Sequence, residues 1–208
     1  RPDPTEGKRW LDLVRESRLY YSFPIYLLGN ILGAAGFAVF FGGDWLDFLC
    51  GGLCGLVVGI VTDFLEKMKA NPFFRTIAAA FSMALVAYLM GAVGFCHNAD
   101  SAIIGALMIL VPGLLFTNAM RDIIYGDTTS GVNRIVQVVL VAMALALGTA
   151  AAWSVVSGLL GDPAGAAVIS HSALVQCLFC FIGCIGFVIL FNIHGPGGLI
   201  CALGGAAT

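Results

Sequence analysis

The feature that most constrains this chain is a series of long apolar runs without charged residues. Two of them, 135–160 and 173–192, contain no Asp, Glu, Lys or Arg. About 20 apolar residues in a helix cross a bilayer. Only 11% of the residues are charged and 60% are hydrophobic, whereas about 25% are charged in soluble domains. The pattern excludes a water-soluble globular protein and predicts an all-α, polytopic membrane helix bundle.

Apolar runs bounded by charged or turn residues predict six spans and one shorter final run. The spans are placed at 22–42, 46–64, 76–96, 101–120, 135–160 and 173–193, and the final run begins at 198. That last run, 198–208, is too short to cross a membrane. The small residues Gly29 and Gly33, and likewise Gly51, Gly55 and Gly59, lie at helix-face spacing and favour close helix packing.

The basic residues predict the orientation of the chain. All 10 Lys and Arg residues fall in alternate connections: Arg1, Lys8, Arg9, Arg15, Arg18, Lys67, Lys69, Arg75, Arg121 and Arg134. Positively charged connections stay in the cytoplasm. We therefore expect a multi-pass protein of the plasma membrane with a cytoplasmic N-terminus. The formal net charge of -2 gives no basis for a nucleic-acid partner.

An internal repeat links the first and sixth spans. The segment Gly33-Ala-Ala-Gly36-Phe37, continuing to Phe41, matches Gly183-Cys-Ile-Gly186-Phe187, continuing to Phe191, at an offset of 150 positions. Five spans separate the two copies, so they run in opposite directions through the membrane. This predicts the first five-helix half of an inverted repeat plus the beginning of the second half, an arrangement typical of secondary transporters. Chance similarity between spans rich in Gly and Phe is the alternative.

The fourth span contains a helix breaker near its middle. Proline removes a backbone donor and clashes with the preceding turn, so Pro112-Gly113 predicts a break or sharp kink. The half-helix that begins at Gly113 would direct its free N–H groups and positive dipole end into the membrane, where they could bind a carboxylate. A kink that serves only packing is the alternative.

Polar residues follow this break. Thr117, Asn118, Arg121 and Asp122 share one helix face, and Asp127 lies beyond the span. A polar face that continues from a break in the membrane favours a substrate pathway. Arg121 and Asp122 as ordinary interfacial charges are the alternative.

These residues resemble the signature of the threonine/serine exporter family, P-G-x4-N-x2-R-D-x3-G-D-x2-S-G-x2-R. It is matched by Pro112, Gly113, Asn118, Arg121, Asp122, Gly126, Asp127, Ser130, Gly131 and Arg134. Gly36-Phe37 and Gly42-Gly43 look like the family's first span, and the sixth span looks like the opening of its second membrane domain.

The resemblance implies export of threonine and serine driven by the proton motive force. Two-subunit relatives are associated with dicarboxylate export, so a succinate-type exporter subunit is an alternative, as is a non-transporting membrane scaffold or channel. The implied partners are the substrate, the proton, the lipid bilayer and the remainder of the second membrane domain, fused or as a separate subunit. The domains would be a cytoplasmic amphipathic lead-in at 1–21, a five-span exporter domain at 22–160, an extracytoplasmic linker at 161–172 and the truncated start of a second membrane domain at 173–208.

The expected substrate site consists of residues around the break: Pro112, Gly113, Thr117, Asn118, Arg121 and Asp122. Four further residues are expected in the pathway or in proton coupling: Asp63, Asp127, Ser130 and Arg134. Asp63 as part of a solvated helix end is the alternative. Asn30 and Gln137 are interpreted as buried polar residues that bond across helices, and contact with the substrate is the alternative.

No enzyme activity is expected. Ser170-His171-Ser172 is adjacent in sequence but lacks the surroundings of a serine nucleophile. The cysteines inside apolar runs are interpreted as small packing residues. The three histidines lie in separate loops, so neither a metal site nor a cofactor is predicted.

Overall fold

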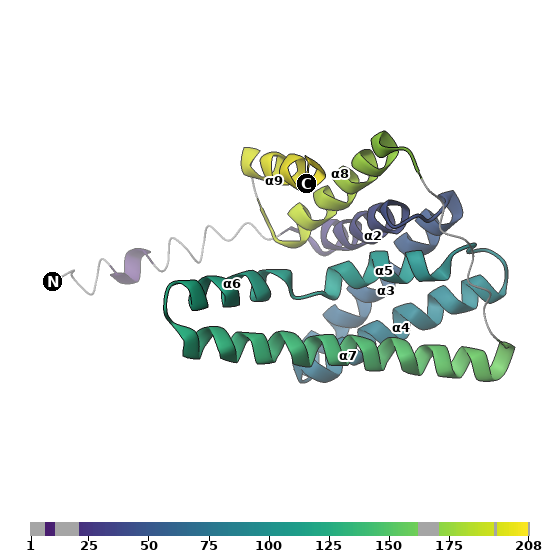
Figure 1. The fold of residues 1–208 in the computed structure, drawn as a ribbon, viewed down its shortest axis with the longest axis horizontal. Coiled ribbons are helices and arrows are strands. Elements are labelled where there is room, and N and C mark those ends of the chain that lie inside the picture. Colours follow the sequence, from purple (N-terminus) through teal and green to yellow (C-terminus); the bar gives the residue numbers. More distant parts are fainter. Residues whose placement is uncertain (1–6, 11–20, 162–170, 194, 208) are drawn as a thin grey trace.

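The computed structural model describes residues 7–10, 21–161, 171–193 and 195–207, and within them every regular element is a helix. Figure 1 shows their arrangement. The main helices are α2 (Phe23–Phe40), α3 (Trp45–Lys67), α4 (Pro72–Ala92), α5 (Ala99–Leu110), α6 (Gly113–Ile124), α7 (Thr128–Leu160), α8 (Ala173–Leu190) and α9 (Pro196–Ala207). The predicted all-α fold class is confirmed. Most of the predicted lead-in at 1–21 and of the linker at 161–172, including Ser170, lies outside the described residues.

The predicted membrane spans are confirmed as helices. Among the described residues, five helices are long and apolar enough to cross a membrane, and the bent pair α5–α6 makes a sixth if the two helices together form one broken span. The final helix, α9, has 12 residues and is shorter than a span. Because successive spans alternate in direction, Lys67, Arg75, Arg121 and Arg134 lie near one end of the bundle. We call this the basic end.

Glycines let three neighbouring helices approach the backbone of α2. A Cβ atom added to Gly105 of α5 would lie 2.6 Å from the carbonyl oxygen of Ala34, and one added to Gly55 of α3 would collide with that of Asn30. A Cβ atom added to Gly36 of α2 would likewise lie too close to the backbone of α8. The predicted role of small residues in helix packing is therefore confirmed, and α2 is the central helix of the bundle.

The contact between α2 and α8 is reciprocal. A Cβ atom on Gly36 would lie 2.6 Å from the backbone nitrogen of Gly183, and one on Gly186 would meet that of Gly33. Gly36 and Gly186 are equivalent in the sequence repeat, and so are Gly33 and Gly183. The equivalent rings of Phe37 and Phe187 contact each other with centroids 5.3 Å apart. Such an exchange of contacts is characteristic of a local two-fold axis.

The two helices also end alike. Each has 18 residues, and Ser22 and Ser172 are their N-caps. After α2, the N–H groups of Gly42 and Gly43 donate to Val39 and Ala38. After α8, the N–H groups at the positions 150 residues later, Asn192 and Ile193, donate to Ile189 and Val188. Gly42 and Asn192 both have positive φ angles, of 92° and 55°, as in Schellman-type helix ends. That the whole second half repeats the first stays a prediction.

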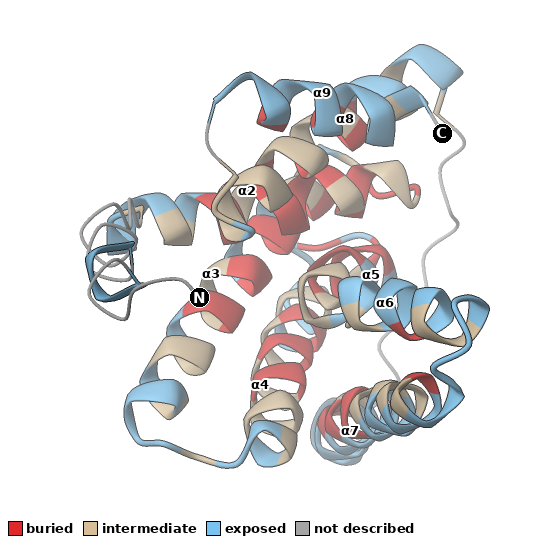
Figure 2. Cartoon of the chain, turned by 90° about the vertical axis from the view of Figure 1, so that its left-hand side faces the viewer, coloured by how far each residue is buried: buried red, intermediate tan, exposed pale blue. Residues whose placement is uncertain are grey.

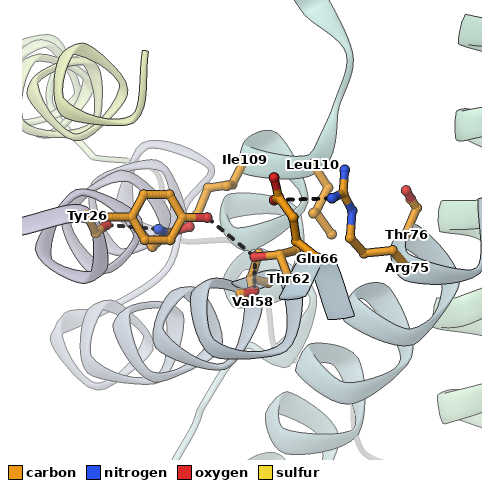
Figure 3. Close-up of a pocket in the computed structure, with 9 residues that line it drawn as sticks. Tyr26, Val58, Thr62, Glu66, Arg75, Thr76, Ile109 and Leu110 are labelled. Atoms are coloured by element: carbon orange, nitrogen blue, oxygen red, sulfur yellow. Dashed lines mark hydrogen bonds and ion pairs between the residues drawn. The ribbon is translucent and has the colours of Figure 1, made fainter. Parts of the chain in front are cut away.

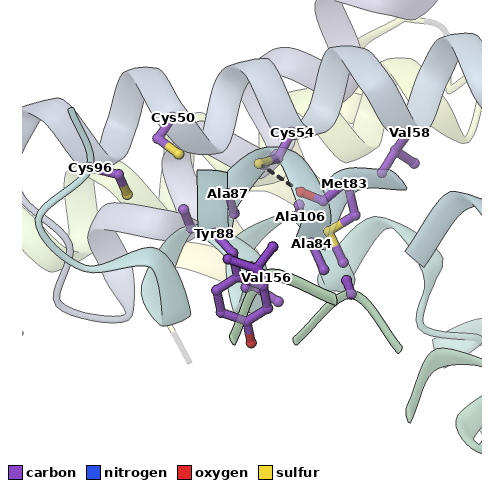
Figure 4. Close-up of a cluster of buried hydrophobic side chains, with 14 residues drawn as sticks. Cys50, Cys54, Val58, Met83, Ala84, Ala87, Tyr88, Cys96, Ala106 and Val156 are labelled. Atoms are coloured by element: carbon purple, nitrogen blue, oxygen red, sulfur yellow. Dashed lines mark hydrogen bonds between the residues drawn. The ribbon is translucent and has the colours of Figure 1, made fainter. Parts of the chain in front are cut away.

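A cluster of buried hydrophobic side chains lies where α3, α4, α5 and α7 meet. Figure 4 shows Cys54 of α3 beside Met83 of α4 and Ala106 of α5, with Cys50 farther along α3 toward Cys96, and the Cys54 thiol donates to the Met83 carbonyl at 3.5 Å. Cys50 and Cys54 are both fully buried, as their predicted packing role requires, whereas Cys177 of α8, which the sequence assigned the same role, is exposed. Figure 2 shows that α6 and much of α7 are exposed, in contrast to the buried faces of α2 to α5.

Candidate functional site

The fourth span breaks where Pro112 predicts it. The helices α5 and α6 are bent by 53° relative to each other. Val111 is extended, with ψ 127°, and Pro112 serves as the N-cap of α6 with φ -81° and ψ 58°. No heavy atom of a neighbouring described residue lies within 4 Å of a Cβ atom added at Gly113. The break therefore exposes the first turn of α6 to open space.

The residues predicted to bind substrate lie on an exposed helix. Thr117, Asn118 and Arg121 are exposed, and α6 packs mainly on α7. The Thr117 hydroxyl donates to the carbonyl of Gly113 at 3.1 Å. Within the described residues these side chains lie on an exposed face of α6.

A network of polar contacts joins the end of α6 to the start of α7. One carboxylate oxygen of Asp122 pairs with Nε of Arg134 at 3.1 Å and accepts from the hydroxyl of Ser130 at 3.2 Å. Asp127, the N-cap of α7, accepts from the backbone N–H of Ser130 at 3.2 Å. Arg121 lies over the ring of Tyr125 and is not part of this network. The structure thus brings together Asp122, Asp127, Ser130 and Arg134 at the basic end.

The ion pair between Asp122 and Arg134 should couple the two helices only modestly. The two side chains are 24% and 38% exposed, and exposed pairs contribute about 0.2–1 kcal/mol. We expect a double-mutant cycle of Asp122→Ala and Arg134→Ala to give a coupling free energy of unfolding of about 0.5–1 kcal/mol in detergent. A coupling above about 2 kcal/mol would contradict a solvent-screened pair and indicate a buried one.

A polar cavity lies beside the broken span. Its volume is about 250 Å³, and it opens among α2, α3, α4 and the end of α5. We call it the Asn30 pocket, after the residue on α2 that forms part of its wall. Its lining residues are Tyr26, Asn30, Val58, Thr62, Glu66, Arg75, Thr76, Ile109 and Leu110. Because Leu110 is the last residue of α5, the pocket adjoins the break.

The lining of the Asn30 pocket carries paired polar groups. Figure 3 shows the Tyr26 hydroxyl directed toward Thr62, at 3.4 Å, and Glu66 directed toward Arg75. Arg75 Nη1 donates to a Glu66 carboxylate oxygen at 3.2 Å. The Arg75 side chain is 30% exposed and that of Glu66 is 73% exposed. The ionic groups therefore lie at the mouth of the pocket, near the basic end.

Asn30 is the buried polar group of this pocket. It has no exposed surface, and its Nδ2 donates to the backbone carbonyl of Tyr26 at 2.9 Å. Of the buried side-chain nitrogen and oxygen atoms in the described residues, Asn30 Oδ1 is the one that has no hydrogen-bond partner. An unsatisfied buried acceptor costs about 1–3 kcal/mol, so this oxygen is a candidate for contact with a ligand.

The other polar residues considered from the sequence lie elsewhere. Asp63 pairs with Lys67 at 2.7 Å, one turn along α3, and is not part of the pocket lining. The interpretation of Gln137 as buried is wrong, because it is exposed on α7, where no described helix covers it. The sequence pattern favoured a structural role for Asn30 over contact with the substrate, and it did not reveal the grouping of Asn30 with Thr62, Glu66 and Arg75. The available signal was the i, i+4 spacing of Tyr26 with Asn30 and of Thr62 with Glu66 on adjacent spans.

Comparisons with known proteins give one family and one curated relative. Residues 1–156 match the family model described as "Putative threonine/serine exporter". The chain is 26% identical over 141 residues to a protein named threonine/serine exporter from Corynebacterium glutamicum. This match covers 66% of the chain and 29% of the relative, so the chain spans less than a third of that relative's length. No solved structure matches the chain.

Proposed function

The chain belongs to the threonine/serine exporter family, and we propose that it forms part of a secondary active transporter that exports small carboxylate-bearing metabolites, with threonine and serine as the favoured substrates. The proton motive force is the proposed driving force. The observation that carries this proposal is the broken fourth span, with its 53° bend, beside a polar cavity. Broken helices in transporters supply backbone groups and dipole ends to substrates and coupling ions.

The substrate path is proposed to follow α6. The first turn of α6 would attract the substrate carboxylate at Pro112 and Gly113, because a helix N-terminus favours negative charge. Thr117 and Asn118 would donate hydrogen bonds along the exposed face. Arg121, Asp63, Asp127, Ser130 and Arg134 would shape the entrance at the basic end, which the positive-inside rule assigns to the cytoplasm of the plasma membrane. Asp122 would exchange its contact with Arg134 for a proton or the substrate amino group.

The open face of α6 would be covered by the second half of an inverted repeat. The exchanged contacts of Gly36 with Gly183 and of Gly186 with Gly33 support this arrangement. An approximate two-fold axis through the Phe37–Phe187 contact would relate α2 to α8 and α3 to α9. A domain that repeats α2 to α7 could then close the path, and the two halves could rock about the axis to expose the site to either side.

Counterflow in proteoliposomes tests the proposed function. We expect vesicles that contain the purified protein and are loaded with unlabelled threonine to accumulate labelled threonine or serine. Asn118→Ala and Asp122→Asn should each lower the exchange rate at least tenfold, which corresponds to a rise of about 1.4 kcal/mol in the activation free energy. Ser82→Ala on α4 should leave the exchange rate unchanged. A protonophore should abolish net export driven by a pH gradient and leave exchange intact.

The alternative functions give different results in the same assay. Exchange of labelled succinate without exchange of threonine would indicate a dicarboxylate exporter. Absence of exchange with either substrate would favour a scaffold, and a flux without exchange kinetics would favour a channel. Unchanged rates in both variants would refute the α6 path and leave the exporter function standing.

A further inference from the structure

We propose that the Asn30 pocket selects hydroxy-amino acids, with Asn30 Oδ1 accepting a hydrogen bond from the side-chain hydroxyl of threonine or serine and with Arg75 and Glu66 holding the zwitterionic end at the mouth. This inference rests on the proposed function and deepens it. The pocket would hold the substrate before it reaches the first turn of α6, and Asn30 is the residue that would distinguish these amino acids from other substrates. Three observations on the pocket carry this inference.

The first observation is the fixed orientation of the Asn30 amide. Its Nδ2 donates to the Tyr26 carbonyl at 2.9 Å, and a carbonyl oxygen only accepts, so the reversed amide would oppose two acceptors. The oxygen therefore points to the other side, where it has no partner among the described residues. Gly59 makes room for this amide, because a Cβ atom there would lie 3.2 Å from Asn30 Cγ. The Asn30 oxygen needs a donor from outside the described residues.

The second observation is the separation of charged and uncharged groups along the pocket. Asn30 is fully buried, whereas the Arg75 and Glu66 side chains are 30% and 73% exposed. Burial of a charged ammonium group against a neutral amide is costly, and burial of a hydroxyl with a hydrogen bond is not. The hydroxyl therefore takes the deep position. At the mouth, the carboxylate meets Arg75, which keeps free donors beyond its bond to Glu66, and the ammonium group meets Glu66.

The third observation is the weak contact between Tyr26 and Thr62, which both line the pocket. Thr62 donates its hydroxyl to the Val58 carbonyl at 2.6 Å, so the Tyr26 hydroxyl is the donor in its 3.4 Å contact with Thr62. This distance exceeds the usual range for O–H···O bonds. Asn30 has no exposed surface, so a ligand needs a movement of the lining to reach it, and Tyr26 is a lining residue held by this weak contact. The cavity of about 250 Å³ has room for roughly eight waters at ~30 Å³ each, enough for threonine or serine.

The same groups disfavour a dicarboxylate. Succinate carries two negative charges and no donor at neutral pH, so it leaves Asn30 Oδ1 unsatisfied and places a carboxylate near Glu66. Valine has nearly the shape of threonine but lacks the hydroxyl. Sites built to bind a hydroxyl reject analogues without it, because a buried polar group stays unpaired. Threonine and valine are therefore the decisive pair of ligands.

The test is the stabilisation of the detergent-purified protein by ligands, measured as the melting temperature against ligand concentration. We expect threonine and serine to raise the melting temperature of the wild type, with an apparent Kd at least tenfold lower than that of valine or succinate. Asn30→Leu should reduce the preference for threonine over valine to less than threefold. This variant should fold, because it replaces an unsatisfied buried group with an apolar one of similar size. Ser82→Ala, whose hydroxyl donates within α4, is the control and should keep the preference.

The outcomes separate this inference from the proposed function. Equal effects of threonine and valine on the wild type, no stabilisation by threonine, or a preference that survives in Asn30→Leu would each overturn the role of Asn30. Counterflow of threonine together with any of these results would leave the exporter function standing. An Asn30-dependent preference for threonine without counterflow would support the pocket and contradict transport.

Discussion

Asp47→Ala is expected to lower the melting temperature of the protein by roughly 6–20 °C, which corresponds to about 3–5 kcal/mol of unfolding free energy at this size. The Asp47 carboxylate is fully buried in the first turn of α3. Its Oδ1 accepts from the backbone N–H groups of His97 and Asn98 at 2.8 and 2.9 Å and from the Cys96 thiol at 3.1 Å. Its Oδ2 accepts from the Asp44 N–H at 2.8 Å. Alanine leaves these donors buried or half-buried without an acceptor.

The conservative change at the same position should have a smaller effect. In the Asp47→Asn variant, the amide side chain keeps one oxygen for the loop after α4 but presents an NH₂ group to the Asp44 N–H, so we expect roughly half of the loss. Asp100→Asn, on an exposed residue of the adjacent helix turn, is the control and should stay within about 0.5 kcal/mol of wild type. Thermal unfolding in detergent measures all three variants. A melting temperature for Asp47→Ala within about 2 °C of wild type, less than a 1 kcal/mol change produces at this size, would refute the role of this carboxylate.

The spans and the break were predictable because their signals are local. Inside a membrane, the backbone N–H and C=O groups of a long apolar run must form hydrogen bonds within the protein, as they do in a helix. All but the fourth of the predicted spans are continuous helices. The fourth divides at Pro112, as the missing N–H and the steric clash of proline require. The end of α3 and the start of α7 extend beyond the predicted runs because these turns carry polar residues that apolarity does not detect.

The Asn30 pocket was not predictable, because it depends on how two helices are rotated against each other. Tyr26 and Asn30 lie on α2, and Thr62 and Glu66 lie on α3. They face each other because glycines of α3 admit the α2 backbone and the Asn30 amide on one face of the helix. In the sequence, these glycines indicate close packing but not the partner helix. The buried amide is therefore interpreted from the sequence as a packing residue, and its unpaired oxygen is visible only in three dimensions.

The interpretation of Gln137 shows the converse error. A glutamine inside a long apolar run suggests a buried partner, yet the side chain is exposed on α7. The faces of α6 and α7 that the other described helices leave open are broad (Figure 2). A single sequence does not specify which side of a membrane helix faces lipid, a neighbouring helix or another domain, since all three accept apolar residues.

Gly36→Leu and Gly186→Leu are expected to be severely disruptive, and to be so by similar amounts. The added Cβ atom alone would lie 2.6 Å from the Gly183 nitrogen in the first variant and would collide with the Gly33 backbone in the second. In each variant the Cβ atom is fixed by its own backbone and would meet backbone atoms of the facing helix, so no side-chain rotation relieves the contact, and α2 and α8 must separate. Overpacking costs about 1–3 kcal/mol where side chains can adjust, and we expect more than about 3 kcal/mol here, with loss of most folded protein.

The matched control is Gly158→Leu, at an exposed helical position of α7 with no neighbouring described atom within 4 Å of its Cβ. This variant should fold as the wild type does, because an exposed position on a membrane helix accepts leucine and because leucine has a higher helix propensity than glycine. Size-exclusion chromatography and thermal unfolding in detergent give the comparison. Equal losses at Gly36 and Gly186 are what a two-fold relation between α2 and α8 requires. If Gly186→Leu behaves as Gly158→Leu does while Gly36→Leu unfolds, the tight packing around Gly36 belongs to α3 and α5, α8 is a peripheral helix, and the inverted repeat loses its structural support.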